Sequence, residues 1–160
     1  MNTKLQEQPM PKAKDIMSSN VLTVSPDMSV RELAAKLMER NVSGAPVLDD
    51  TGNLLGIVTE SDLVEQRKHL HLPTVVTLFD SVMAFEGHFD LKTQMKKMLG
   101  SKVADIMSGE VTTVKEDADM EDIATIMAEQ KRHLIPVMRG TAVVGIIGKA
   151  DIVRAIVKGS

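Results

Sequence analysis

The hydrophobic positions of the chain predict the same helix twice. From Val30 to Met38 the apolar residues recur at intervals of three and four, which is the period of a helix with one buried face. Ser29, with Glu32 three residues later, is the pattern that caps the start of such a helix. We expect the buried stripe to contain Val30, Leu33, Ala34, Leu37 and Met38. The second occurrence has Asp119 as its cap and the stripe Met120, Ile123, Ala124 and Met127.

Two aliphatic runs joined by a turn follow each of these helices. Pro46–Leu48 and Leu54–Val58 are separated by the turn residues DDTGN, and the second copy has a tighter turn at 139–141. We therefore expect a β-hairpin in each copy. A short extended segment precedes each first helix and a further helix follows each hairpin: Val21–Val24 and Val111–Val114 for the segments, and Ser61 and Ala150 for the approximate starts of the following helices.

The two copies align along their whole length. Residues 13–48 match 103–138 at a constant offset of 90 positions, and the offset becomes 89 after the tighter turn. Each copy reads β-α-β-β-α and would expose too much apolar surface alone, so we expect the copies to pack together. The predicted divisions are a flexible N-terminal tail at 1–12, a first repeat at 13–68, an insert at 69–100 and a second repeat at 101–160.

The insert is predicted to be helical. Its first part, TVVTLFDSVMAFE, is mostly apolar, and its second part, LKTQMKKML, is amphipathic. All three phenylalanines of the chain fall within it. We expect it to pack against the repeats or against a second subunit.

Composition excludes several functions. The net charge of −3, without any long basic run, argues against a nucleic-acid partner. The absence of cysteine excludes disulfides, thiol chemistry and thiolate metal sites. No apolar run reaches the length of a membrane span, and the N-terminus lacks the apolar core of a signal peptide. We expect a soluble, cytoplasmic protein without a membrane partner.

One short phrase occurs in both copies. GIVTESD at 56–62 returns as GIIGKAD at 145–151, at the point where a strand meets a helix. On spacing alone, Thr59 caps the helix and Asp62 is its third residue. The free N–H groups of a helix start also suit a phosphate, and a nearby hydroxyl and carboxylate suit a phosphorylated ribose. Gly148 preserves a cap but removes the hydroxyl, and the spacing leaves both interpretations open.

Taken together, the repeated motifs resemble the CBS domain, and a tandem pair of them resembles a Bateman module. The motifs are DIM before the first strand, SGAPVL or HLIPVM, and Gly-apolar-apolar-Thr-x-x-Asp, and they cover about 13–68 and 101–158. The resemblance implies a mixed α/β (α+β) fold in which two β-α-β-β-α repeats pack with pseudo-twofold symmetry. It also implies two clefts that bind adenine-containing ligands in many relatives, each cleft using residues from both repeats.

The resemblance assigns one set of candidate ligand residues to a stronger cleft. Asp62 is expected to hold the ribose, Thr59 a phosphate, and Arg132 with His133 the remaining phosphate charge. The whole set is Ile57, Thr59, Ser61, Asp62, Thr112, Arg132, His133 and Leu134.

A second set belongs to the other cleft: Leu22, Val42, Ser43, Gly44 and Asp151. This cleft departs from the family pattern at Gly148 and Ala150, where hydroxyls are expected, and it has no cation at Val42 or Ser43. We therefore expect it to be weak or empty.

Catalysis and metal binding find little support. There is no G-x-S-x-G, Walker loop or G-x-G-x-x-G pattern, so we predict neither an enzyme nor a catalytic cofactor. Asp49 and Asp50 form a carboxylate pair, but they lie in a predicted turn, where aspartate is common. His69, His71 and His88 are most simply solvent-facing residues, and no metal is predicted.

The leading functional interpretation is a non-catalytic regulatory sensor. It binds AMP, ADP or ATP between the repeats, forms a homodimer, and signals to a regulated protein in trans by a change of shape. One alternative is a sensor of S-adenosylmethionine or a related nucleoside. Another is a structural dimerisation module whose clefts are vestigial.

Overall fold

The computed structural model describes residues 9–68 and 101–159, which form two similar halves. In chain order, the first half contains α1 (Ala13–Ile16), α2 (Val30–Arg40), β1 (Gly44–Leu48), β2 (Leu54–Thr59) and α3 (Glu60–Lys68). The second contains α5 (Val103–Ile106), β3 (Val114–Lys115), α6 (Met120–Glu129), β4 (Leu134–Arg139), β5 (Ala142–Gly148) and α7 (Lys149–Lys158). The predicted helical insert at 69–100 lies outside the described residues.

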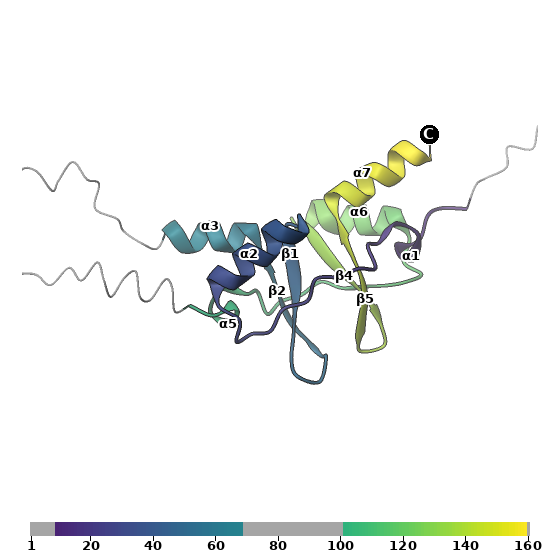
Figure 1. Ribbon diagram of the computed structural model, residues 1–160. Coiled ribbons are helices and arrows are strands. Elements are labelled where there is room, and N and C mark those ends of the chain that lie inside the picture. Colours follow the sequence, from purple (N-terminus) through teal and green to yellow (C-terminus); the bar gives the residue numbers. More distant parts are fainter. Residues whose placement is uncertain (1–8, 69–100, 160) are drawn as a thin grey trace, which may run out of the picture.

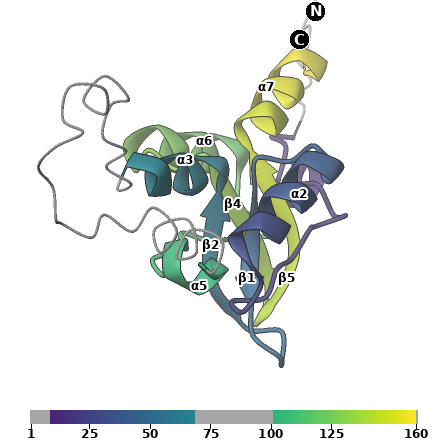
Figure 2. The same cartoon turned by 60° about the vertical axis from the view of Figure 1, so that its left-hand side comes forward.

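Each half is built on an antiparallel hairpin, β1 with β2 and β4 with β5. A parallel partner flanks each hairpin at the same register, because Val24 pairs with Val47 just as Val114 of β3 pairs with Val137 of β4. The turns of both hairpins lie at one end of the molecule, and the longer helices gather away from them (Figures 1 and 2). The predicted pair of β-α-β-β-α repeats with pseudo-twofold symmetry is confirmed.

The predicted extended segments are shorter than expected. Strand pairing begins only at Val24 in the first repeat and at Val114–Lys115 in the second. In the first repeat, Val21 and Leu22 instead line a cavity between the repeats. Val21 and Leu22 therefore lie between the two repeats, and the chain pairs with the strands of its own repeat only from Val24 onward.

The amphipathic helices cover the hairpins with the predicted stripes, apart from one residue. Leu33 and Leu37 of α2 are buried, as are Ile123 and Met127 of α6. Met38 was expected in the stripe, but its side chain is 80% exposed. It follows Leu37 directly, and a turn of about 100° per residue carries it to the helix flank, beyond the reach of the sheet.

The two cores exchange their first helical turns. We call residues 13–18 and 103–108 the first and second arms. Ala13 of the first arm is buried in the core of the second repeat, and Val103 of the second arm is buried in the core of the first. Their N–H groups donate across in the same way, Ala13 to the Ala118 carbonyl and Val103 to the Met28 carbonyl, both at 2.8 Å. The first arm therefore completes the core of the second repeat, and the second arm completes the core of the first.

Each arm then crosses a glycine of the opposite hairpin. Ser18 exchanges two backbone hydrogen bonds with Ile146, at 2.9 and 3.0 Å, and Ser108 does the same with Ile57 at 2.9 Å. A Cβ on Gly56 would lie 2.7 Å from the Ser108 carbonyl oxygen, and a Cβ on Gly145 would overlap the side chain of Met17. Glycine therefore leaves room for backbone at the first crossing and for the Met17 side chain at the second.

The helix cap predicted for α2 is present, whereas the one predicted for α6 is not. The Ser29 hydroxyl accepts from the Glu32 N–H at 3.1 Å, as predicted. Asp119 occupies the N-cap position of α6, but its side chain makes no capping bond. It accepts from Lys12 Nζ at 2.7 Å instead, and this hydrogen bond raises the pKa of Lys12. A distant partner therefore replaces the local cap.

The turn between β1 and β2 is organised by one carboxylate. Asp49 Oδ1 accepts from the N–H groups of Thr51 and Asn53 at 2.9 and 2.8 Å. These hydrogen bonds, that of Asn53 first, lower the pKa of Asp49 to about 2. The predicted turn role of Asp49 is confirmed.

The described helices are all much shorter than a bilayer is thick. The α2 helix has 11 residues, whereas a membrane-spanning helix needs about 20. Within residues 9–68 and 101–159, no helix is long and apolar enough to span a membrane.

Candidate functional site

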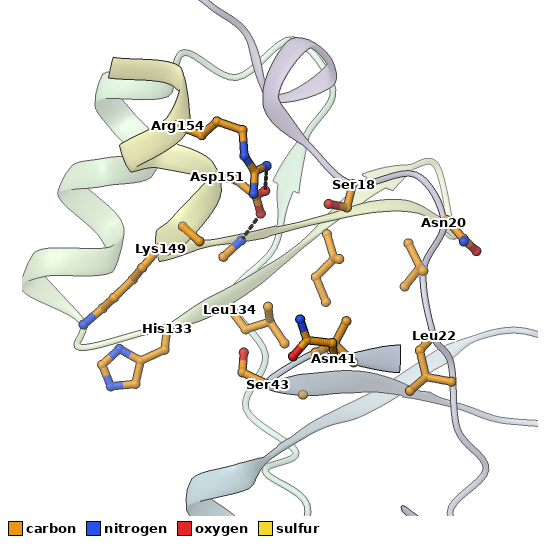
Figure 3. Close-up of a pocket in the computed structure, with 16 residues that line it drawn as sticks. Ser18, Asn20, Leu22, Asn41, Ser43, His133, Leu134, Lys149, Asp151 and Arg154 are labelled. Atoms are coloured by element: carbon orange, nitrogen blue, oxygen red, sulfur yellow. Dashed lines mark hydrogen bonds and ion pairs between the residues drawn. The ribbon is translucent and has the colours of Figure 1, made fainter. Parts of the chain in front are cut away.

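A cavity of about 370 Å³ opens between the two repeats at the start of α7. We call it the α7 cleft (Figure 3). Its walls come from the chain after the first arm, from the end of α2 through the start of β1, and from the β5–α7 junction. It brings together all five residues predicted for the weaker cleft: Leu22, Val42, Ser43, Gly44 and Asp151.

The structure adds cations that the sequence analysis did not place here. Lys149 and Arg154 line the α7 cleft, together with His133, and Asn20 and Asn41 supply further polar side chains. In Figure 3, Lys149 and His133 lie together at one side, and Arg154 lies over Asp151. The family resemblance predicts a cation only at the end of α2, at the positions of Val42 and Ser43, whereas the cations of this cleft are two residues before and three residues after Asp151.

The Asp151 carboxylate is held by two hydrogen bonds. Oδ2 accepts from the Gly148 N–H at 2.8 Å, and Oδ1 accepts from Arg154 Nη1 at 2.8 Å. The Asp151 side chain is only 12% exposed, while that of Arg154 is 59% exposed. A mostly buried carboxylate therefore lies at the cleft wall beneath an accessible guanidinium.

The equivalent junction at the start of α3 has the same capping geometry. Asp62 Oδ2 accepts from the Thr59 N–H at 2.7 Å and from the Thr59 hydroxyl at 3.0 Å. The capping role of Asp62 is therefore confirmed, whereas the Thr59 hydroxyl donates to Asp62 instead of accepting from an N–H of the helix. The other carboxylate oxygen, Oδ1, has no hydrogen-bond partner among the described residues. The geometry thus leaves Asp62 free to accept from a ligand as well.

We call the site predicted around this junction the α3 cleft. Of its eight residues, His133 and Leu134 line the α7 cleft. Ile57 is buried and pairs with Ser108 of the second arm, while Thr112 Oγ1 lies 2.8 Å from Gln130 Oε1. Ser61 is exposed at the start of α3.

Arg132 carries an unusual feature. Its Nε is buried and has no hydrogen-bond partner among the residues that the structure describes. Buried N–H donors are almost always paired, so an unpaired Nε is an exception that a bound ligand would explain. It lies in the chain segment that the resemblance assigns to phosphate binding.

Leu134 lies between the two junctions. A Cβ placed on Gly44 would come within 3.0 Å of both Leu134 Cδ2 and Thr59 Cγ2, and one on Gly148 would lie 3.7 Å from Leu134 Cδ1. The starts of α3 and α7 therefore lie on either side of the Leu134 side chain.

No metal centre is found within the described ranges, where no three His, Asp or Glu side chains gather in a way that could hold an ion. His69, His71 and His88 lie outside those ranges.

The repeated fold, with a cavity between its halves, defines a module of two tandem repeats. The chain belongs to the CBS domain family, whose model matches residues 13–69 and 103–158. CBS pairs of this kind are generally regulatory rather than catalytic.

Related proteins share this organisation. The chain is 28% identical to protein MJ1426 of Methanocaldococcus jannaschii over 155 residues, which cover 90% of each chain. It is 30% identical to the chloroplastic CBS domain-containing protein CBSX2 of Arabidopsis thaliana over 145 residues, 85% of this chain and 58% of the relative.

Solved structures extend the likeness to three dimensions. The crystal structure of CBSX2 in complex with AMP has a TM-score of 0.69 at 26% identity, covering 92% of this chain and 96% of that one. A crystal structure of the CBS domain pair of protein MJ0100, in complex with 5′-methylthioadenosine and S-adenosyl-L-methionine, has a TM-score of 0.69 at 25% identity. It covers 91% of this chain and 99% of that one.

Proposed function

We propose that this CBS pair is a non-catalytic sensor that binds AMP, ADP or ATP between its repeats and reports binding by a change of shape. The α7 cleft is the observation that carries the proposal. Its volume of about 370 Å³ lies in the range of small-molecule sites. It combines an acceptor for ribose hydroxyls, Asp151, with the cations Lys149 and Arg154 for phosphate.

The α3 cleft is proposed as the second nucleotide site. Asp62 would accept from the ribose hydroxyls through Oδ1, and the open Nε–H of Arg132 would donate to a phosphate. The Thr59 hydroxyl donates to Asp62, so it would have to turn away to reach a ligand. The sequence favours this cleft as the stronger one, and that order stays a prediction.

Relatives support an adenine ligand without specifying which one. CBSX2 binds AMP, and the MJ0100 pair binds 5′-methylthioadenosine and S-adenosylmethionine. The second complex favours the alternative of a nucleoside sensor for this chain too. We rank that alternative lower, because the sulfonium cation of S-adenosylmethionine would be repelled by Lys149 and Arg154.

We also propose that the protein is a homodimer. On α7, Val153, Ile156 and Val157 are 60%, 55% and 70% exposed. A hollow of about 470 Å³ beside them, between α6 and α7, is lined partly by Ala124 and Met127. Exposed apolar faces of this kind mark interaction sites, and a second copy offers the matching face. Light scattering should give twice the mass of the 17.4 kDa chain, and Val157→Asp should reduce it to one chain.

The sensor requires a regulated protein in trans, which the ligand-dependent shape would recognise. In the structural-module alternative, the protein would only dimerise through this apolar face, and the clefts would bind no ligand. Ligand binding separates these two possibilities.

The test begins with the ultraviolet spectrum of gently purified protein. The chain has no Trp or Tyr, so a co-purified adenine compound would dominate absorbance near 260 nm and can be identified by mass spectrometry after denaturation. Titration with AMP, ADP, ATP and S-adenosylmethionine should then raise the melting temperature. A ligand at a hundred times its Kd stabilises the folded state by about 2.7 kcal/mol. Absence of both a bound adenine and any thermal shift would overturn the proposal in favour of the structural module.

A further inference from the structure

The carboxylate at the α7 cleft is already occupied. Asp151 Oδ1 accepts from Arg154 Nη1 and Oδ2 from the Gly148 N–H, both at 2.8 Å. Figure 3 shows the Arg154 side chain reaching back along α7 to this carboxylate at the cleft wall. A ribose hydroxyl that approaches Oδ1 therefore competes with the guanidinium for this oxygen.

The start of α3 has no such obstacle. At the offset of 89, Arg154 corresponds to Glu65 and Lys149 corresponds to Glu60. The first repeat thus places acidic residues where the second places cations, around an aspartate in the same capping geometry. Of the two junctions in the described part of the chain, only the one at α7 has an arginine bonded to its aspartate.

The cost of displacing Arg154 depends on the charge of the ligand. A phosphorylated nucleoside offers the released guanidinium a new anion, and arginine binds phosphate through paired hydrogen bonds. An uncharged nucleoside offers none, and it leaves the cation of Arg154 with solvent. A cationic sulfonium adds repulsion from Arg154 and Lys149.

Among the described residues, Asp15 is a further anion near Arg154. Arg154 also lines a groove of about 230 Å³ between α1 and α7, together with Asp15 and Lys158. Asp15 is exposed, its Oδ2 accepts from the Lys12 N–H at 2.8 Å, and Lys158 lines the same groove. An ion pair between Arg154 and the exposed Asp15 would contribute little free energy, so Asp15 does not replace a ligand phosphate.

From this geometry we propose that Arg154 sets the charge preference of the α7 cleft, admitting phosphorylated adenine nucleotides in preference to uncharged or cationic adenine nucleosides. The inference rests on the proposed function, because it concerns the selectivity of the same site. Arg154 acts as an internal competitor for Asp151 when the ligand is uncharged and as a phosphate ligand when the ligand is a nucleotide.

The test compares AMP with adenosine, which differ only by the phosphate, and follows each cleft by its own backbone amide. The Gly148 N–H donates to Asp151 and the Thr59 N–H to Asp62, so their NMR signals report binding to the α7 and α3 clefts separately. In the unmodified protein, AMP should bind at Gly148 about tenfold more tightly than adenosine, the effect of one charge-assisted hydrogen bond.

Variants then separate the role of Arg154 from general charge. Arg154→Gln should weaken AMP and strengthen adenosine, reducing the ratio of their affinities at Gly148 by about fivefold or more. Arg154→Lys, which keeps the cation, should largely restore the ratio. Lys149→Gln should weaken AMP without strengthening adenosine, because Lys149 does not cover Asp151. Glu65→Gln, the matched change in the first repeat, should leave the ratio at Gly148 unchanged.

The possible failures are distinct. If neither the Gly148 nor the Thr59 signal moves with any adenine compound, the proposed function falls together with this inference. If nucleotides bind but only Thr59 responds, or if Arg154→Gln leaves the AMP-to-adenosine ratio at Gly148 unchanged, the inference on Arg154 is wrong and the sensor proposal stands.

Discussion

The helix starts of the two repeats share one backbone geometry and carry opposite charges. Asp62 accepts from Thr59 N–H at 2.7 Å and Asp151 from Gly148 N–H at 2.8 Å, so each carboxylate closes the first turn of its helix. The flanking residues are Glu60 and Glu65 in one repeat and Lys149 and Arg154 in the other. The aspartate therefore closes the helix in both repeats, and the two junctions differ in the charges beside it.

The largest effect on stability is expected from substitutions in the two cores. Leu33 and Ile123 occupy equivalent positions in α2 and α6, and both are fully buried. Leu33→Ala and Ile123→Ala should each lower the free energy of unfolding by about 2–5 kcal/mol in urea denaturation. Met38→Ala, on the exposed flank of α2, is the control and should change it little. A cost close to that of Met38→Ala for either core variant would contradict the burial of that residue.

The arm crossings should give the next largest effect and distinguish the repeats. Gly56→Ala and Gly145→Ala should each cost about 1–3 kcal/mol through overpacking. At Gly56 the obstacle includes the Ser108 carbonyl, whereas at Gly145 it is the side chain of Met17. Adding Met17→Ala should therefore offset part of the Gly145→Ala loss, seen as coupling in a double-mutant cycle.

The control for the arm crossings is Gly109→Ala, because a Cβ there meets nothing within 4 Å. Its unfolding transition should coincide with that of the unmodified protein. Additive effects of Gly145→Ala and Met17→Ala would contradict the contact assigned to this pair.

The two aspartates provide a smaller effect on stability with a clear effect on binding. Asp62→Ala and Asp151→Ala should each cost about 1 kcal/mol or less, since each removes one helix-end hydrogen-bond acceptor. Each should lower AMP affinity at its own cleft more than about tenfold, measured by calorimetry. Loss of stability with unchanged affinity would support the structural-module alternative.

The smallest predicted effect is the pH dependence that Asp49 gives to the first hairpin. The pKa of Asp49 lies at about 2 in the folded protein, below its ordinary 3.8, so its ionised form stabilises the fold above pH 3.8. This contribution should be lost as the pH falls from 3.8 through 2. Asp49→Asn should therefore narrow the stability difference between pH 5 and pH 2.5, measured by urea unfolding. The tighter turn of the second repeat has Arg139, Gly140 and Thr141 instead.

Local patterns allowed most of the fold to be predicted. The Ser29 cap, the buried Leu33 and Leu37, the two hairpins and the Asp49 turn all depend on contacts within a few residues. The same holds for the capping role of Asp62, whose partner Thr59 is three positions away.

The features that were missed depend on distant partners. Lys12 replaces a local capping role of Asp119 from 107 residues away. The exchanged arms are invisible to the repeat alignment, since it assigns Ala13 to the repeat that it precedes in sequence. Lys149 and Arg154 were overlooked because the resemblance places the phosphate cations after the first helix of a repeat, not around the aspartate of the second. Only the folded chain shows that both reach the same cavity.

The exchange of arms couples the two halves during synthesis. The core of the first repeat contains Val103, with Ile106 and Met107 packed against it. A nascent chain that has completed α3 therefore still lacks part of the core of its first repeat and must wait until the second arm emerges. Such non-local closure slows folding. It also means that a protease cut between residues 69 and 100 should leave two fragments that remain bound, because each fragment holds a piece of the other's interior.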